Sequence, residues 1–286
     1  MSSPSTNTAA AAGASVSVHV CAPADTPLVL SVPHAGVGTT GFDAAMVPSL
    51  DVRNDADLFV DRLYGVAAGA AGSWRGPYVV AGLSRFVCDM NRDPDDVSPQ
   101  AVPEHPAPRN ADGRGFIWAV TTEGKPTMSR PLTLGEWRAR QAVHAVYHGA
   151  IREALNMARA RFGFAVLLDG HSMPSVGRTG HKDPGRPRAD VVPGDRDGTS
   201  CSPALSRLVQ AHFRARGYSV AFNDPYKGGF ITAHHGRPHD HVHAIQIELR
   251  RDLYMDETKF ELIPDRAARL QQTLRELLTA LDGFKP

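Results

Sequence analysis

Hydrophobic positions in this chain form two kinds of pattern that alternate along the sequence. Short apolar runs bounded by polar or turn-forming residues predict strands, and apolar residues that recur every three or four positions predict helices. The predicted strands span residues 29–32, 78–80, 164–168, 218–222 and 243–249, with a further β-type run at 86–88. The predicted helices span residues 55–68, 133–161, 202–216 and 264–281. Strands separated by helices of this length require right-handed crossovers, so we predict an α/β fold with three α/β/α layers and a mostly parallel mixed sheet.

Local signals mark the ends of three of these helices. Thr133 and Glu136 form a capping box, in which a hydroxyl and a carboxylate each satisfy a backbone donor of the first turn. Ser202 supplies a cap and Pro203 suits the first helical position, while Gly283 follows the last helix as a stop signal. We therefore expect these helices to begin and end close to the predicted positions.

Two segments fall outside the alternation. The sequence of residues 1–16 predicts a disordered N-terminal tail. A single α/β domain is then expected over residues 17–286. Residues 95–130 are rich in proline, glycine and charge, which indicates a long excursion over the surface that could also cover a site. We find neither an internal repeat nor an interdomain linker.

Composition excludes several classes of partner. The 286 residues are 42% hydrophobic, enough for a sizeable core, and the formal net charge of +1 gives no reason to expect a nucleic acid or a membrane surface as partner. The three cysteines lack paired spacing, which favours a reducing compartment and a cytoplasmic location over a disulfide framework. No apolar run is long enough to cross a bilayer, and the N-terminus does not resemble a secretory signal. The oligomeric state cannot be inferred from the sequence.

Two histidines follow apolar runs in the same way, where open α/β sheets place their ligand sites. His34 comes after the run that begins at Leu28, and His171 comes after residues 164–168. An ordinary loop histidine explains either stretch alone, but the pair favours a metal site with a carboxylate as third ligand. The candidates for that ligand are Asp55, Asp57 and Asp61, and their spacing does not choose among them because acids are also common in a first helical turn.

An acid within an apolar strand is the next candidate. Glu248 lies in the run 244–249, where a buried carboxylate is costly unless it is paired or used. Beside a metal-bound water it could take a proton and pass it to a leaving amine. The alternative is an ion pair with Arg250 or Arg251. Gln246 lies on the same face of the strand and could support Glu248.

Several polar residues could bind an acidic ligand. Arg85, Asn91 and Arg92 surround the run 86–88, and a guanidinium group binds a carboxylate as a fork. Lys227 precedes a glycine pair and could reach an anion, although surface ion pairing explains each cation equally well. A dense histidine run is more typical of a solvated loop than of a metal site, and its last member is the best placed to support Glu248. These histidines are His234, His235, His239, His241 and His243.

An ordered set of motifs resembles the N-formylglutamate amidohydrolase family over roughly residues 28–257. The motifs are Ser31-Val-Pro-His-Ala-Gly36, Asp55-Ala-Asp-Leu-Phe-Val-Asp-Arg-Leu-Tyr64, Ser84-Arg-Phe-Val-Cys-Asp-Met-Asn-Arg92, Leu168-Asp-Gly-His-Ser172, Asp197-Gly-Thr-Ser-Cys201, Lys227-Gly-Gly-Phe-Ile-Thr232 and His243-Ala-Ile-Gln-Ile-Glu248. The resemblance implies a metal-dependent amidohydrolase with a fold similar to zinc carboxypeptidases and aspartoacylase. It also implies hydrolysis of N-formyl-L-glutamate to formate and L-glutamate in histidine degradation.

The resemblance also implies roles for the metal-site residues. His34 and His171 would be ligands of one zinc ion, and Glu248 would activate the attacking water. Val37 stands where carboxypeptidase-like relatives carry a glutamate ligand, and the family's aspartate at the start of the next helix points to Asp57, with Asp55 and Asp61 as alternatives. Iron, cobalt or manganese would suit the same donors.

For the substrate, the resemblance matches Asn91 and Arg92 to a pair that holds a carboxylate, with Arg85 as a second clamp and Lys227 nearby. Arg85 or Asn91 would also stabilise the oxyanion. The expected partner is therefore a small acidic N-acyl amino acid. Three alternatives remain at this point: an amidohydrolase for other N-acyl amino acids or short peptides, a metal-free acid/base site, and a non-catalytic binding protein for an anionic metabolite. Residues 114–122 and 180–187 lie outside these motifs and could shape the pocket.

Overall fold

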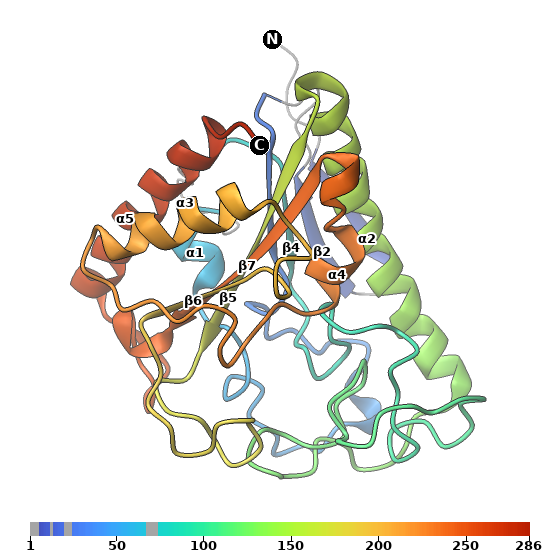
Figure 1. Cartoon of the computed structure of the whole chain (residues 1–286). Coiled ribbons are helices and arrows are strands. Elements are labelled where there is room, and N and C mark those ends of the chain that lie inside the picture. Colours follow the sequence, from blue (N-terminus) through green and yellow to red (C-terminus); the bar gives the residue numbers. More distant parts are fainter. Residues whose placement is uncertain (1–5, 12–13, 20–24, 67–73) are drawn as a thin grey trace.

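A mixed sheet runs through the centre of the molecule (Figure 1). The computed structural model describes residues 6–11, 14–19, 25–66 and 74–286. Among these, seven strands pair in the order β1-β2-β4-β3-β5-β7-β6. They are β1 (Thr6–Ala11), β2 (Ala14–His19), β3 (Leu28–Val32), β4 (Tyr78–Ala81), β5 (Ala165–Met173), β6 (Val191–Gly194) and β7 (Val242–Arg250). The central strands β4, β3, β5 and β7 are parallel and the outer pairings are antiparallel, which confirms the mostly parallel mixed sheet.

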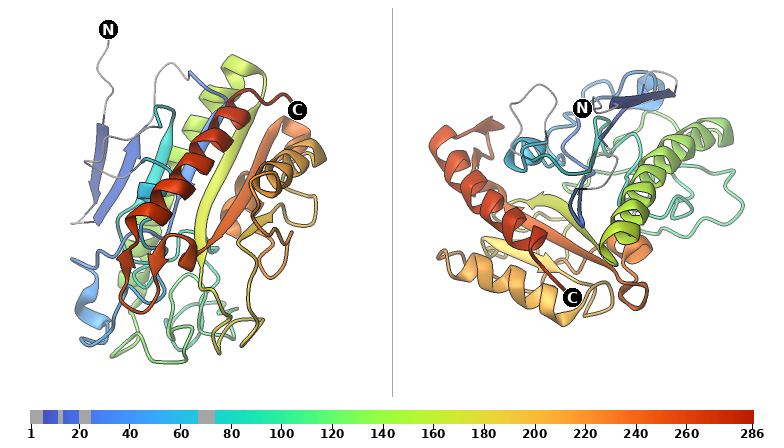
Figure 2. Two further views of the ribbon diagram at one scale, coloured as in Figure 1. Left: turned by 90° about the vertical axis from the view of Figure 1, so that its left-hand side faces the viewer. Right: turned by 90° about the horizontal axis from the view of Figure 1, so that it is seen from above.

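Helices cover both faces of this sheet. Figure 2 shows α2 (Leu134–Phe162) on one side and α3 (Pro203–Arg214) with α5 (Pro264–Asp282) on the other. The short helix α4 (Phe230–His235) joins the α2 side, and α1 (Val60–Leu63) joins the α5 side. The remaining elements are the 3₁₀ turns η1 (Asp43–Ala45), η2 (Pro238–Asp240) and η3 (Arg251–Leu253), and the small hairpin of β8 (Met255–Asp256) and β9 (Glu261–Leu262). The predicted α/β/α layering is confirmed.

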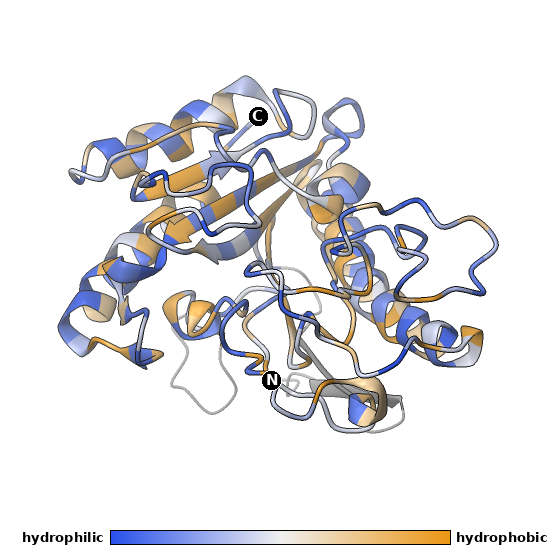
Figure 3. Ribbon diagram, turned by 90° about the horizontal axis from the view of Figure 1, so that it is seen from below, coloured by the Kyte–Doolittle hydropathy of each residue, from blue (hydrophilic) through white to orange (hydrophobic). Residues whose placement is uncertain are grey.

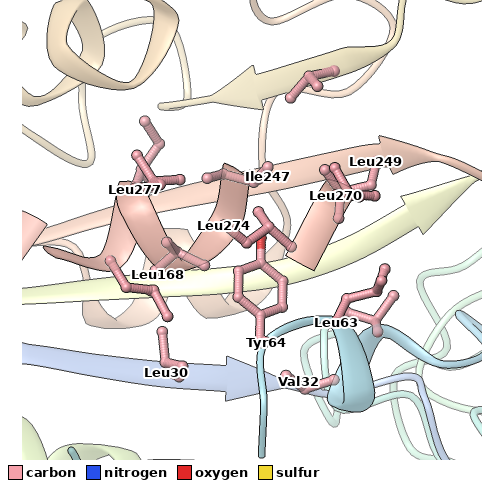
Figure 4. Packing of buried hydrophobic residues seen from close by; sticks show 14 of the residues in the cluster. Leu30, Val32, Leu63, Tyr64, Leu168, Ile247, Leu249, Leu270, Leu274 and Leu277 are labelled. Carbon is pink, nitrogen blue, oxygen red and sulfur yellow. The ribbon is translucent and has the colours of Figure 1, made fainter. Parts of the chain in front are cut away.

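Two hydrophobic cores follow from the alternation of side chains along the strands. Val29 packs in the core beneath α2, whereas its neighbour Leu30 packs in the core beneath α5. Figure 4 shows Leu30 and Leu168 from the sheet facing Leu274 and Leu277 of α5. The central strands are buried on both faces, which explains why they read as continuous apolar runs.

The helix end signals act as the sequence predicts. The Thr133 hydroxyl accepts from the Glu136 backbone, and the Glu136 carboxylate accepts from the Thr133 backbone. The Ser202 side chain caps α3 ahead of Pro203. The observed bounds of α2, α3 and α5 differ from the predicted bounds by two residues or fewer.

Three predicted elements are wrong in whole or in part. The helix predicted at 55–68 is reduced to α1 in its described part, because Phe59 adopts a left-handed φ of 67° and the Asp57 amide donates to the His34 carbonyl at 2.8 Å. Residues 67 and 68 lie outside the described residues. The runs 86–88 and 218–222 are not strands: Val87 lies in a turn closed by Ser84, and Val220 makes a single bridge to Val191. For the predicted helix, a tertiary hydrogen bond outweighs the local pattern, whereas the turn at Val87 is closed within its own segment.

Strand β5 is longer than its apolar run. It continues through Asp169, Gly170 and His171 to Met173, with His171 in register beside Glu248 of β7. The polar residues therefore stand on the strand itself, where the sheet fixes their direction. The N-terminus also differs from the expected loose tail, because residues 6–11 and 14–19 form β1 and β2, and the alternation of serine and valine at 15–18 is typical of a strand. Residues 1–5 and 12–13 lie outside the described residues.

Loops gather below the carboxyl ends of the central strands (Figure 1). Seen from that side, the loops are predominantly hydrophilic and the strands behind them hydrophobic (Figure 3). Residues 95–130 contain no helix or strand, yet Val97, Phe116 and Ile117 anchor this segment in the core. Cys88 and Cys201 are buried free thiols, and Cys21 lies outside the described residues. None of the described helices combines the length and apolar character needed to cross a membrane.

Candidate metal and active site

Three predicted ligands converge at the carboxyl end of the sheet. His34 follows β3, Asp57 lies in the turn before α1, and His171 stands on β5. All three are buried, and one potential ligand atom from each lies within 4.8 Å of the others. The hydrogen bond from the Asp57 amide to the His34 carbonyl holds the aspartate beside the histidine. The structure thus brings together residues from three distant parts of the chain.

Each imidazole is oriented by a second carboxylate. His34 Nε2 lies 2.7 Å from Asp89 Oδ1, and His171 Nε2 lies 2.8 Å from Asp169 Oδ2. A carboxylate only accepts hydrogen bonds, so each ring donates from Nε2 and can offer its Nδ1 to a metal. The two Nδ1 atoms lie 3.5 and 3.2 Å from Asp57 Oδ2, and His34 Nδ1 has no hydrogen-bond partner among the described residues. Two imidazole nitrogens and one carboxylate oxygen are a donor set that fits a divalent cation.

Electrostatics keep the acids of this group ionised. Burial alone would raise the pKa of Asp57, but the neighbouring imidazoles of His171 and His34 outweigh it and hold the pKa well below the ordinary value. Arg251 also donates to Asp57 Oδ1 at 3.2 Å. Burial opposes ionisation of Asp89 in the same way, and the positive charge of Arg85 overcomes it to lower the pKa of Asp89. The site is therefore rich in negative charge despite its burial.

The two alternative aspartates do not reach this group. Asp55 is buried but its carboxylate accepts from the hydroxyl and the amide of Thr122 and from Arg178. Asp61 is half-buried in α1 and is not among the described residues that line the cavity. Of the three candidates, the structure places only Asp57 beside both histidines.

Glu248 faces the same cavity from β7. Its side chain is buried, and its Oε1 accepts a hydrogen bond of 2.9 Å from Gln246 Nε2. Burial raises the pKa of Glu248 to about 7, although the neighbouring charge of His171 opposes the shift. The ion pairs considered as an alternative are not formed, because Arg250 pairs with Asp190 and Asp252 and Arg251 pairs with Asp57. Glu248 is thus left without a cationic partner among the described residues.

A cavity of about 620 Å³ opens above the metal-ligand group, and all four predicted substrate-binding residues line it. Arg85 is already held by Asp89 at 2.8 Å and lies over the Trp118 ring. Lys227 pairs with Asp197 at 2.7 Å. Among the described residues, Arg92 donates only to the backbone carbonyls of Arg114 and Asn91.

Asn91 is packed tightly against the start of α4. Its Oδ1 accepts from the Ile231 amide at 2.8 Å, and its Nδ2 donates to Gln246 at 3.3 Å. A Cβ atom at Gly229 would lie 2.5 Å from both polar atoms of the Asn91 amide. The glycine before Phe230 is therefore required for this close approach.

Several residues of the site were not predicted from the sequence. Asp169 could have been found, because it lies two residues before His171 on the same strand face, and Asp89 because it opens the Asn91–Arg92 motif. The cavity-lining Trp118, Arg114 and Arg196 come from loops and had no periodic signal. In the histidine run, His235 is buried rather than solvated. His243 accepts from the Ser202 amide at the other end of β7 and is not among the cavity-lining residues.

Known proteins resemble this chain over most of its length. The family model for N-formylglutamate amidohydrolase matches residues 26–255. Proteins named N-formylglutamate deformylase from Pseudomonas putida and Pseudomonas aeruginosa are each 36% identical to the chain, over 89% of it and 92% of their own length. A crystal structure of N-formylglutamate amidohydrolase from Ralstonia eutropha JMP134 matches with a TM-score of 0.80 and 34% identity, covering 94% of this chain and 97% of that one. A crystal structure from Agrobacterium tumefaciens, covering 93% of this chain and 95% of its own, shares the fold at 22% identity and a TM-score of 0.63.

Proposed function

Because the chain belongs to the N-formylglutamate amidohydrolase family and is a hydrolase of linear amide C–N bonds, we propose that it hydrolyses N-formyl-L-glutamate to formate and L-glutamate, a step of histidine degradation. The proposal depends on one observation: His34, Asp57, His171 and Glu248 all line the same cavity. The two relatives named as N-formylglutamate deformylases support the choice of substrate.

A single divalent ion, zinc in our proposal, would be held by His34, Asp57 and His171. When bound, it would supply Lewis acidity at the formyl carbonyl and lower the pKa of a water. The carboxylates behind the two imidazoles fit this role, because they fix ring orientation and raise ligand basicity. Iron, cobalt and manganese accept the same donors and are distinguished by metal analysis.

Glu248 is the proton carrier in this proposal. It accepts a proton from the attacking water, the water oxygen bonds to the formyl carbon, and the carboxyl group then gives the proton to the departing amine as the C–N bond breaks. The hydrogen bond from Gln246 holds the carboxylate in place between these two transfers. Both proton transfers are thus assigned to one side chain, at a position with no cationic partner among the described residues.

The arginines that line the cavity divide into those with a carboxylate partner and those without one among the described residues. Arg85 is engaged by Asp89, so we assign it with Asn91 to stabilising the charge that develops on the formyl oxygen. Arg92, Arg114 and Arg196 have no carboxylate partner in the described part of the chain. A dicarboxylate substrate would supply that partner, and we assign these three guanidinium groups to it. Lys227 would have to leave Asp197 to contribute.

Formate release tests the proposal directly. Protein purified without chelator is incubated with N-formyl-L-glutamate, then treated with chelator, and finally restored with zinc. We expect formate and glutamate in equal amounts, loss on chelation and recovery with metal. N-acetyl-L-glutamate, N-formyl-L-aspartate and short peptides are assayed beside it. Faster cleavage of one of these would overturn the substrate assignment, whereas ligand-induced thermal stabilisation without formate would indicate a binding protein.

A further inference from the structure

Two buried histidines of α2 hold the backbone on either side of Asn91. His144 Nε2 lies 3.0 Å from the Arg92 carbonyl, and His148 Nε2 lies 2.9 Å from the Met90 carbonyl. The histidines are four residues apart and so lie on one face of the helix. The carbonyls are two residues apart and belong to the segment that carries Asn91 and Arg92 into the cavity. One face of α2 therefore holds this segment through two hydrogen bonds.

The direction of these hydrogen bonds is fixed. A carbonyl oxygen only accepts, so both imidazoles donate from Nε2. His148 Nδ1 lies 2.9 Å from His235 Nε2 of α4, and a neutral ring that donates from Nε2 can only accept there. Burial lowers the pKa of His148 to about 2 and that of His235 to about 3, which keeps both rings neutral. Both nitrogens of His148 are thus engaged, so the ring is a structural clamp and not a metal ligand.

The same segment is held from a second side by α4. The Ile231 amide of α4 donates to the Asn91 side chain, and Gly229 packs against it. Phe230 packs against both His144 and His148, with ring centroids 5.6 and 5.2 Å apart. The buried histidines therefore link α2, α4 and the cavity wall in one polar cluster.

We propose that His144 and His148 are positioning residues, which fix the Asn91–Arg92 segment so that both side chains meet the substrate in one geometry. The proposal rests on the proposed function, because that function assigns Arg92 to a substrate carboxylate. Preorganised donors bind without the entropic cost of ordering a loop. Neither histidine touches the cavity itself, since neither is among the described residues that line it.

Paired substitutions test this role. His144→Leu and His148→Leu remove the donor, whereas His144→Gln and His148→Gln place an amide donor near the original Nε2. We expect each leucine variant to raise KM about tenfold, the scale of one lost buried hydrogen bond, with a smaller change in kcat and full metal content. The KM of the glutamine variants should be close to that of the wild-type protein. Where leucine prevents folding, His144→Asn and His148→Asn replace it, because asparagine keeps a polar side chain but is too short to place its donor at the original Nε2.

A matched control comes from α3. His212 is buried and its Nε2 also donates to a backbone carbonyl, that of Thr273, at 2.9 Å. His212→Leu should lower stability but leave KM unchanged. Combining His144→Leu with Arg92→Ala should add little to the KM effect of Arg92→Ala alone if the histidine acts through the arginine. An unchanged KM in the leucine variants, a failure of glutamine to rescue, or full additivity would overturn the proposal.

Hydrogen exchange separates this proposal from the proposed function. The Asn91 and Arg92 amides donate to the side chain and carbonyl of Asp89. Their exchange should accelerate in His144→Leu and His148→Leu but not in the glutamine variants, whether or not the wild-type protein releases formate. Wild-type protein without formate release would end the proposed function alone. Unchanged exchange in the leucine variants would end the positioning role alone.

Discussion

Asp89 shows how single residues organise this site. Its two oxygens accept from His34, from the Asn91 amide, from Arg85 and from the Trp118 indole, while its side chain is fully buried. A buried carboxylate survives in charged form only when its hydrogen bonds and nearby cations offset desolvation. One aspartate thereby connects a metal-ligand candidate, an oxyanion-stabilising candidate and the substrate-binding segment.

Glu248→Gln is the most direct test at this scale. Glutamine keeps the shape of the side chain, and its amide oxygen can still accept from Gln246, but it cannot carry a proton. We expect kcat to fall by at least about 100-fold while the metal content, measured by elemental analysis, stays the same. Glu276→Gln on the exposed side of α5 is the matched control and should be active. A variant at Glu248 within a few-fold of wild type would remove the assigned role.

The sequence predicts such residues unevenly. His34, His171 and Glu248 stand out because each interrupts or follows an apolar run. This pattern is visible in the sequence alone. The choice among three aspartates could not be made, because it depends on Thr122 and Arg178 occupying Asp55 from distant loops. The motifs indicate guanidinium groups near the site, but they do not show which of these groups already have a carboxylate partner.

At the scale of elements, local signals succeed where the interactions that end a helix are also local. The capping box of α2 spans only four residues and the Ser-Pro start of α3 only two, and both helices begin as predicted. The helix predicted at 55–68 was wrong in its extent because the Asp57 amide bonds to the His34 carbonyl, 23 positions earlier in the chain. The site thus replaces the first turns of a helix with the turn that carries Asp57.

The capping box supplies a stability prediction with a pH dependence. Thr133→Ala should lower the free energy of unfolding by about 1 kcal/mol. Hydrogen bonds from Arg130, and to a lesser degree those of Thr133, lower the pKa of Glu136 to about 2, below its unfolded value of about 4.3. Because the folded-state pKa is depressed, the stabilisation is present above the unfolded pKa and is lost as pH falls toward 2.

Glu136→Gln should therefore be less stable than wild type at neutral pH, and the difference should narrow between about pH 4.3 and pH 2. Urea unfolding at several pH values measures it. A difference that stays constant or widens toward low pH would contradict the role of the Glu136 charge. We expect the effect to be modest, since Glu136 is partly solvent-exposed and its ion pair with Arg130 is screened.

A second prediction at this scale concerns the start of α4. Gly229→Ala would add one methyl group beside the Asn91 side chain. That group would lie 2.5 Å from the Asn91 amide and displace it. We expect kcat/KM to fall about tenfold or more, mainly through kcat, because Asn91 is assigned to the charge on the formyl oxygen and small displacements of such groups are costly. Gly149→Ala in α2, where the methyl group meets no atom closer than 3.8 Å, should leave kcat/KM unchanged and add up to about 1 kcal/mol of stability.

For the whole molecule, the order of strands explains why the site exists where it does. β3, β5 and β7 are neighbours and run parallel, so their carboxyl ends meet at one edge of the sheet. His34, His171 and Glu248 come from these three strands or the residue pair after them. The parallel order could be predicted from alternating strands and helices. The irregular segments that close the cavity could not, because buried anchors such as Phe116 and Ile117 hold them in place without periodicity.

Metal binding should accordingly stabilise the whole fold. A ligand present at 100 times its dissociation constant adds about 2.7 kcal/mol to the free energy of unfolding when the unfolded chain does not bind it. We expect zinc to produce an increment of that size in chemical denaturation, measured against chelated protein. The increment should vanish in Asp57→Asn and persist in Asp61→Asn, because the first aspartate faces both histidines and the second lies outside the described cavity lining. Asp57→Asn also removes the ion pair of Arg251, which lowers stability with or without zinc. Because each increment compares the same variant with and without zinc, that loss cancels. Equal increments in the two variants would mean that the metal binds elsewhere.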